Sequence, residues 1–416
     1  MPITGPETLN RRQFLSGCAG CAACAMCGTA APPPAAPNDK CRVRLVFAHP
    51  VPTRQGWPYQ GYDYESRKKE LTARLSAACP NTAFLPAASK GAEDTAQILK
   101  DDGEVDGYLV YLLGIPARVS ADIAAAGRPT ILVDDLYGGT GEFLTNFAAL
   151  KRKGMKVAGV SSTRFQDVVD AVRVLETLKR LRSDVILDVR EGDLGADAKG
   201  IQENFGVTVR QTSAEEINTA YETADLAEAR KSAALWIQHA EKIVEPSREE
   251  IGKSGRMHVA MRGLMQRHNA RAITIDCLRL FYGGKLPAYP CLGLFQFNND
   301  GLVGACEADL QSTITMLAMT TLTGRPGYIS DPVIDTSKNQ IIYAHCVAPS
   351  KVYGPSGPEN PYHFVGSGEP LPHPRPFRRS QRRLRAFAHA SGRDHHHAEI
   401  PPGAKRSRHA SGQNCC

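Results

Sequence analysis

Three polar side chains stand at the ends of expected buried strands or inside one. Glu307 separates a short apolar run from a helical pattern, which places it at a predicted strand-to-helix junction. Asp331 ends the predicted strand 327–330, and His345 lies inside the apolar run 340–347. A buried carboxylate or imidazole without a partner is costly, and convergence on one divalent cation would remove that cost. Two oxygens and one nitrogen suit Mn²⁺ or a similar ion.

A structural interpretation of the same residues stays open at this point. Glu307 could cap the helix that follows it, and Asp331 could cap a turn. His345 could be a buried histidine whose hydrogen bonds are satisfied by its neighbours. The spacing alone does not separate these roles from metal binding.

The elements that must position these side chains begin with an α/β domain predicted for residues 37–181. The apolar run 106–113 is typical of a strand buried on both faces, and 165–181 has a helical period. Further strands are predicted at 42–48, 129–134 and 155–160, and further helices at 65–78, 93–100 and 120–126. Strands that alternate with helices predict a doubly wound, Rossmann-like parallel sheet.

A second doubly wound α/β domain is predicted for residues 182–323, and it carries Glu307. Its strands are expected at 184–188, 207–209, 272–276, 291–297 and 302–305, and its helices mainly at 214–244, 255–268 and 310–321. A truncated, mostly β C-terminal domain is predicted for 324–364, carrying Asp331 and His345. The fold class is therefore α/β, with two Rossmann-like domains followed by this β segment.

A glycine-rich stretch, 138–141, lies between a predicted strand and a predicted helix, as a dinucleotide-binding loop would. Leu144 stands where that fingerprint needs its third glycine. A tight strand-to-helix turn is therefore the preferred interpretation, with a nucleotide site as the alternative.

Charge and cysteine content are concentrated at the two ends of the chain. Residues 366–416 hold ten Lys or Arg against three Asp or Glu, an excess equal to the whole formal charge of +7. The remaining body is neutral, so it indicates neither nucleic acid nor an anionic membrane as a partner. Six of the twelve cysteines lie in the body among apolar neighbours, as small buried hydrophobes do. No apolar run is long enough to span a bilayer.

The first 36 residues are predicted to be an export signal. Arg11 and Arg12, followed by a weakly apolar stretch up to Ala31, are similar to a twin-arginine signal. This predicts export to the periplasm, with a cytoplasmic location as the alternative. Cysteines at 18, 21, 24 and 27 also allow an iron–sulfur interpretation, and Cys18 a lipoprotein one, but small residues are usual in such a region.

The region around the three polar side chains resembles the active-site stretch of the L-fucose/L-arabinose isomerase-like family. The resemblance rests on residues 305–310 (ACEADL), 322–326 (LTGRP), 331–332, 344–346 and Pro349. In L-fucose isomerase the two metal-binding carboxylates are 24 positions apart, as Glu307 and Asp331 are here. His345 corresponds best to the histidine that follows the second carboxylate in L-arabinose isomerase. The resemblance covers about 95 residues and is one of fold alone before residue 270.

The resemblance implies an aldose–ketose isomerase with Glu307, Asp331 and His345 around one divalent ion, Mn²⁺ above all. Such a reaction moves a proton between C1 and C2 of the sugar through an enediol. A cation at O1 and O2 acts as a Lewis acid, and carboxylates take and return the proton. Glu307 and Asp331 would then be both ligands and acid/base groups. A small sugar substrate and a homo-oligomer are implied as well.

Four further residues are weaker candidates. Asp276 could position substrate or cap a turn, and Asn298 could contact a sugar hydroxyl or simply form the predicted turn 298–301. Trp57 is similar to an aromatic residue that neighbouring subunits contribute in fucose isomerases. The family needs a further histidine after His345, and His363 could supply it.

The last segment, residues 365–416, departs from the family. It contains four large aliphatic residues and six of the chain's twelve histidines, and it shows no period of a helix or strand. It is predicted to be disordered and to result from a shifted reading frame. Two other functions remain open: an exported sugar-binding protein without catalysis, and an inactive isomerase homologue.

Overall fold

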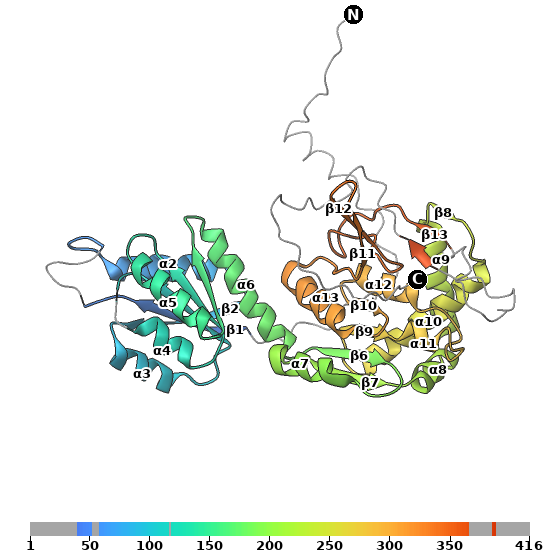
Figure 1. Cartoon of the computed structure of the whole chain (residues 1–416), viewed down its shortest axis with the longest axis horizontal. Coiled ribbons are helices and arrows are strands. Elements are labelled where there is room, and N and C mark those ends of the chain that lie inside the picture. The colour runs from blue at the N-terminus through green and yellow to red at the C-terminus, as the bar shows by residue number, and fades with distance from the viewer. Residues whose placement is uncertain (1–39, 52–57, 116–117, 366–384, 388–416) are drawn as a thin grey trace, which may run out of the picture. The chain divides into compact units, whose positions relative to one another are not determined.

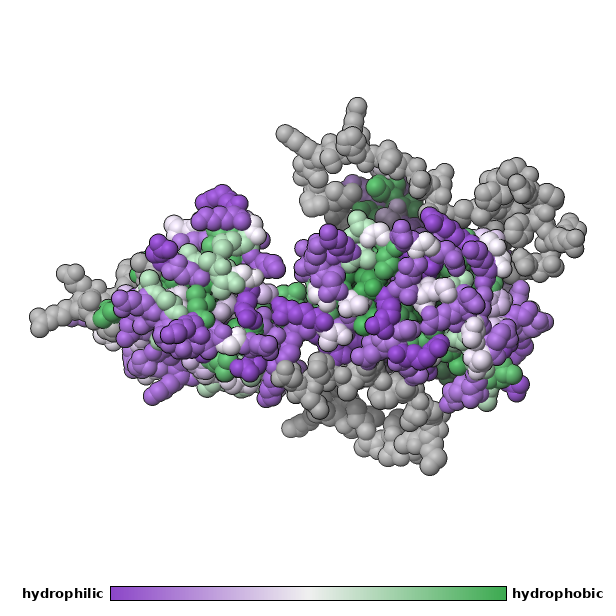
Figure 2. All heavy atoms as spheres, turned by 90° about the horizontal axis from the view of Figure 1, so that it is seen from below, coloured by the Kyte–Doolittle hydropathy of each residue, from purple (hydrophilic) through white to green (hydrophobic). Residues whose placement is uncertain are grey.

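The computed structural model describes residues 40–51, 58–115, 118–365 and 385–387. The predicted export signal, Trp57 and most of the predicted disordered segment lie outside the described residues. Among the described helices, none is both long and apolar enough to cross a bilayer. On the face in view in Figure 2, polar residues surround smaller apolar patches.

The first described unit is a five-stranded parallel sheet in the order β2-β1-β3-β4-β5, flanked by helices (Figure 1). Its strands are β1 (Cys41–Ala48), β2 (Thr82–Ser89), β3 (Gly107–Leu112), β4 (Thr130–Asp134) and β5 (Val157–Ser161). Its helices are α2 (Tyr64–Ala78), α3 (Ala92–Asp101), α4 (Val119–Ala125), α5 (Thr140–Arg152) and α6 (Phe165–Leu181). The predicted doubly wound parallel arrangement is confirmed here.

Both faces of this sheet are covered because alternate strand residues point to opposite sides. On one side Leu45 and Leu109 share a core cluster with Leu75 of α2 and Val172 of α6. The residues next to them along β1 and β3 share a second cluster with α4 and α5, formed by Val46, Val110, Ile123 and Phe143. The central strand β3 is buried throughout, which is why it reads as a continuous apolar run.

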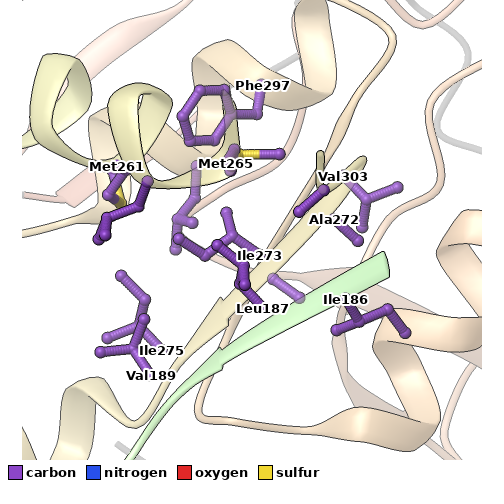
Figure 3. Packing of buried hydrophobic residues seen from close by; sticks show 14 of the residues in the cluster. Ile186, Leu187, Val189, Met261, Met265, Ala272, Ile273, Ile275, Phe297 and Val303 are labelled. Carbon is purple, nitrogen blue, oxygen red and sulfur yellow. The ribbon is translucent and has the colours of Figure 1, made fainter. Parts of the chain in front are cut away.

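The second described unit contains a four-stranded parallel sheet in the order β10-β9-β6-β7. Its strands are β6 (Val185–Val189), β7 (Thr208–Thr212), β9 (Ala272–Ile275) and β10 (Val303–Cys306). Its helices are α7 (Gly195–Phe205), α8 (Ala214–Glu222), α9 (Leu226–His239), α10 (Arg248–Arg267), α11 (Cys277–Leu280), α12 (Cys291–Asn299) and α13 (Leu310–Thr323). Figure 3 shows the core of this unit, where Leu187 and Ile273 lie beside Met261 and Met265 of α10.

Two small antiparallel pairings follow. The hairpin of β11 (Asp331–Asp335) and β12 (Gln340–Ala344) includes the predicted turn 335–339. The other antiparallel pair is β13 (His363–Val365) with β14 (Arg385–Phe387), and β13 also pairs in parallel with the short strand β8 (Lys242–Ile243). β14 lies within the segment predicted to be disordered; the other residues of that segment after 365 are outside the described residues.

Two predicted strands are wrong. Residues 291–297 form α12 instead, because an apolar run buried on all sides has no period that separates a helix from a strand. Residues 327–330 have no regular structure, and Asp331 begins a strand where it was expected to end one. Strand β2 was not predicted because Pro86 interrupts its apolar pattern. β2 lies at the edge of the sheet, where a strand can contain a proline.

The glycine-rich stretch forms a tight turn into α5. A Cβ at Gly139 would lie 2.1 Å from the carbonyl oxygen of Leu112, and one at Gly138 would lie 2.5 Å from that of Leu113. Close approach to β3 therefore explains both glycines, in agreement with the preferred interpretation of this stretch.

Candidate metal centre

The structure brings Glu307, Asp331 and His345 together. Each offers one ligand atom, and all three atoms lie within 4.8 Å of one another. His345 Nε2 is 3.7 Å from Glu307 Oε1 and 3.8 Å from Asp331 Oδ2. The His345 side chain is 3% exposed, whereas that of Asp331 is 53% exposed, so the cluster opens to solvent on the Asp331 side.

Glu307 owes its position to an unusual backbone. It follows the last residue of β10, and both Glu307 (φ 69°) and Ala308 (φ 53°) adopt the left-handed conformation that non-glycine residues avoid. The Ala308 carbonyl accepts a hydrogen bond from Arg190 Nη2 at 2.5 Å, and its N–H donates to Ile275 O at 3.0 Å. These bonds hold the strained pair in place.

Residues other than Glu307 and Asp331 cap helix α13 and the turn of the hairpin. The N-cap of α13 is Asp309, whose carboxylate accepts from Ser312 N at 2.9 Å. The turn of the hairpin is capped by Asp335, which accepts from Ser337 N at 3.0 Å. Asp331 instead pairs across the hairpin with Ala344. Antiparallel register therefore brings Asp331 next to the residue that follows Ala344, which is His345.

The surroundings of His345 favour a positive charge. Burial alone would lower its pKa, but contacts with the Cys346 sulfur and with the Glu307 and Asp331 carboxylates raise that pKa to about 10. The Nδ1 atom is 3.5 Å from Cys346 Sγ, so the two ring nitrogens face different groups. Two carboxylates around one imidazolium form a site in which a divalent cation can replace the proton.

The donor set fits a small divalent cation such as Mn²⁺. With donors about 2.1 Å from an octahedral ion, neighbouring donors are about 3 Å apart and opposite donors about 4 Å. The observed separations of 3.7 and 3.8 Å fall between these two values. Small side-chain adjustments are therefore enough for the three residues to bind one ion.

Asp276 and Arg190 follow strands β9 and β6, at the same edge of the sheet as Glu307. β10 pairs with β9 so that Cys306 is opposite Ile275, and β9 pairs with β6 so that Ile275 is opposite Val189. Glu307, Asp276 and Arg190 therefore follow three adjacent parallel strands at one edge, where ligands of such sheets bind. Asp276 caps α11 by accepting from Arg279 N at 3.3 Å. Its predicted role at the substrate stays a prediction.

Arg190 is a candidate that the sequence analysis missed. It pairs with the buried carboxylate of Asp188 at 2.6 Å in addition to its bond to Ala308. Its position directly after a buried parallel strand could have identified it as a site residue. The strand was predicted to end at residue 188, however, so Arg190 was not recognised as the residue that follows it. Arg190 therefore links β6 to the backbone that presents Glu307.

Two of the other predicted site residues, Asn298 and His363, bond to groups outside the cluster. Asn298, in α12 and not in a turn, is buried; its amide donates to Gly304 O and Val347 O, and its Oδ1 accepts from Gly304 N. All its polar atoms are used by the backbone, so the structure gives it a structural role. His363 Nε2 lies 2.6 Å from Glu241 Oε2. Trp57 is outside the described residues.

Known proteins similar to this chain are sugar isomerases by name. Sulfoquinovose isomerases from Priestia aryabhattai and Priestia megaterium are each 29% identical to it over an alignment of 195 residues, and the match covers 43% of this chain and 41% of the relative. A sulfoquinovose isomerase from Alkalicoccus urumqiensis is 25% identical over 189 residues. The matched part is thus about two fifths of the length of these relatives. No protein-family model matches the chain.

Proposed function

We propose that this chain is a divalent-metal-dependent aldose–ketose isomerase. The observation that carries the proposal is the meeting of Glu307, Asp331 and His345, from three separate segments, with ligand atoms within 4.8 Å. The similarity to sulfoquinovose isomerases supports the same class of reaction. Mn²⁺ is the proposed ion because the donors are two carboxylates and one imidazole.

In this proposal the two carboxylates hold and move the proton. Glu307, Asp331 and His345 would hold the divalent ion, which would supply Lewis-acid polarisation of the sugar. One carboxylate takes the proton from C2 of the aldose and, in its protonated form, gives it to C1, while the hydroxyl proton of O2 passes to O1. This gives the ketose through an enediol. Glu307 is held by its strained junction and Asp331 by the hairpin, so the two can approach the sugar from different segments.

The substrate to test first is sulfoquinovose, which the relatives' name indicates, with L-fucose and L-arabinose as comparisons. The export signal, the homo-oligomer and the shifted reading frame remain parts of the proposal. Each of them bears on where and how well the chain works and not on the chemistry of the centre.

The deciding experiment measures metal content and turnover in one preparation. Purified chain is stripped with a chelator, reloaded with Mn²⁺, and assayed for ketose formation from each aldose. Glu307→Gln is expected to lose most bound metal and at least ~100-fold in rate. Glu249→Gln, at an exposed residue of α10 that pairs with Lys253, is the matched control and should behave as the parent.

Full metal occupancy and full activity in Glu307→Gln would sink the assignment. Sugar binding without metal and without turnover in the parent chain would favour the sugar-binding alternative. Metal binding without turnover on any of the sugars would favour the inactive homologue.

A further inference from the structure

A second group of potential ligands lies beside the candidate centre. Cys291 begins α12, Cys306 ends β10, and Cys346 follows β12. Their three sulfurs lie within 4.8 Å of one another. Cys306 Sγ is 3.8 Å from Cys346 Sγ, which is 3.9 Å from Cys291 Sγ. The three thiols come from positions up to 55 residues apart, so this is a cluster made by the fold.

The backbone around these thiols is held firmly. Asn298 of α12 bonds to Gly304, two residues before Cys306, and to Val347, one residue after Cys346. A Cβ at Gly304 would lie 2.5 Å from Leu294 O, so β10 and α12 are in close contact. One side chain thus fixes all three segments that carry the sulfurs, as a preorganised site requires.

We propose that Cys291, Cys306 and Cys346 bind one soft metal ion of the Zn²⁺ or Cu⁺ type. With a metal–sulfur distance of about 2.3 Å, tetrahedral geometry places two sulfurs about 3.8 Å apart and trigonal geometry about 4.0 Å. Two of the three sulfur–sulfur separations, 3.8 and 3.9 Å, match these values, and the third lies within 4.8 Å. A disulfide would instead require two sulfurs to approach to about 2.05 Å.

Each thiol that binds the ion gives its proton to solvent, so the complex forms without an oxidant or a reductant. Cys277, at the start of α11, interacts with Cys306 and offers a fourth thiol. Zinc prefers four ligands in closed sites, whereas three thiolates are enough for Cu⁺.

The two donor sets are chemically distinct although they are neighbours in sequence. Glu307 follows Cys306, and His345 precedes Cys346. The imidazole of His345 lies between them, with Nδ1 toward the Cys346 sulfur and Nε2 toward the carboxylates. Oxygen donors select hard ions and thiolates select soft ones. The chain therefore carries a hard and a soft site side by side, and the soft site does not depend on isomerase activity.

The test uses Cd²⁺ as a spectroscopic probe of thiolate binding. The full chain carries serine in place of its six terminal cysteines, at positions 18, 21, 24, 27, 415 and 416, so that these do not compete. Cd²⁺ is titrated into chelator-treated, reduced protein. An ultraviolet thiolate-to-cadmium charge-transfer band is expected to saturate at one equivalent per chain, and excess Zn²⁺ should remove it.

Three variants make the assignment specific. Cys306→Ser with Cys346→Ser should abolish the band, while Cys41→Ser with Cys79→Ser, two buried thiols of the first unit, should retain it. Glu307→Gln should also retain it, which keeps this result separate from the proposed function. No band in the parent, or an equal band in the Cys306/Cys346 variant, would overturn the proposal. Circular dichroism checks the folding of each variant. If the Cys306/Cys346 variant does not fold, Cys291→Ala replaces it and should weaken Cd²⁺ binding at least tenfold.

Discussion

The structural role of Asn298 gives a prediction that separates packing from substrate binding. Replacing Asn298 with alanine removes two donated bonds, to Gly304 O at 2.9 Å and Val347 O at 3.3 Å, and one accepted from Gly304 N at 2.9 Å. The residue is 1% exposed, so water cannot replace these bonds. The backbone groups of Gly304 and Val347 would be left buried without their partners.

The cost follows from the number of bonds. Each of the three backbone groups left without its partner costs ~1–2 kcal/mol, a penalty that already includes the lost hydrogen bond. Alanine regains ~0.5 kcal/mol through its better helix propensity in α12. We therefore expect Asn298→Ala to lower the free energy of unfolding by ~3–5 kcal/mol. Because Gly304 and Val347 flank the segments that carry Glu307 and His345, Mn²⁺ affinity should also fall, by ~10-fold.

Urea unfolding followed by circular dichroism measures the first quantity, and isothermal titration with Mn²⁺ the second. The matched control is Asn204→Ala, an exposed residue of α7 whose single bond to Gly200 O should be worth under ~1 kcal/mol. If Asn298→Ala keeps its stability within ~1 kcal/mol and only the KM for the sugar rises, then Asn298 contacts substrate and the structural argument is wrong.

Three further predictions address other parts of the chain. Burial and the adjacent guanidinium lower the pKa of His258, so the unfolded chain binds a proton more readily than the folded chain does. The free energy of unfolding should therefore fall by up to ~1.4 kcal/mol per pH unit below about pH 6.5. Urea titrations at several pH values should show a weaker pH dependence for His258→Gln. Arg190→Gln removes the bond to Ala308 and should weaken Mn²⁺ binding ~10-fold by calorimetry, with an unchanged affinity arguing against a positioning role. Arg11→Lys with Arg12→Lys should leave the protein in the cytoplasm on cell fractionation, and unchanged export would refute the twin-arginine interpretation.

Much of the parallel framework was predictable because buried parallel strands produce continuous apolar runs. The strand at 106–113 corresponds to β3 and the helix at 165–181 to α6. The same signal failed at 291–297, where nearly every residue of α12 is buried and the composition of the run fits either a helix or a strand. Sequence patterns separate helices from strands by the spacing of buried and exposed residues. A segment that is buried on all sides has no such spacing.

The candidate centre shows the same division between local and long-range information. That Glu307 lies between a strand and a helix was predictable, because the change of period there is local. The left-handed backbone of Glu307 and Ala308 was not predictable. It is held by a hydrogen bond from Arg190, a residue more than a hundred positions earlier in the chain. The three-thiol cluster was hidden for the same reason: scattered cysteines carry no sign of the fold that brings them together.

Departures from ordinary local structure concentrate in one region of the described chain. Within residues 40–51, 58–115 and 118–365, Glu307 and Ala308 are the only two consecutive non-glycine residues with left-handed backbone. Beside them stand a buried imidazole between two carboxylates and three sulfurs in contact. Each feature costs stability or offers none, and none is required for the strands and helices around it to pack. Such costs persist where the surrounding structure enforces them for a purpose, and the two ion sites proposed above would give one purpose to all of them.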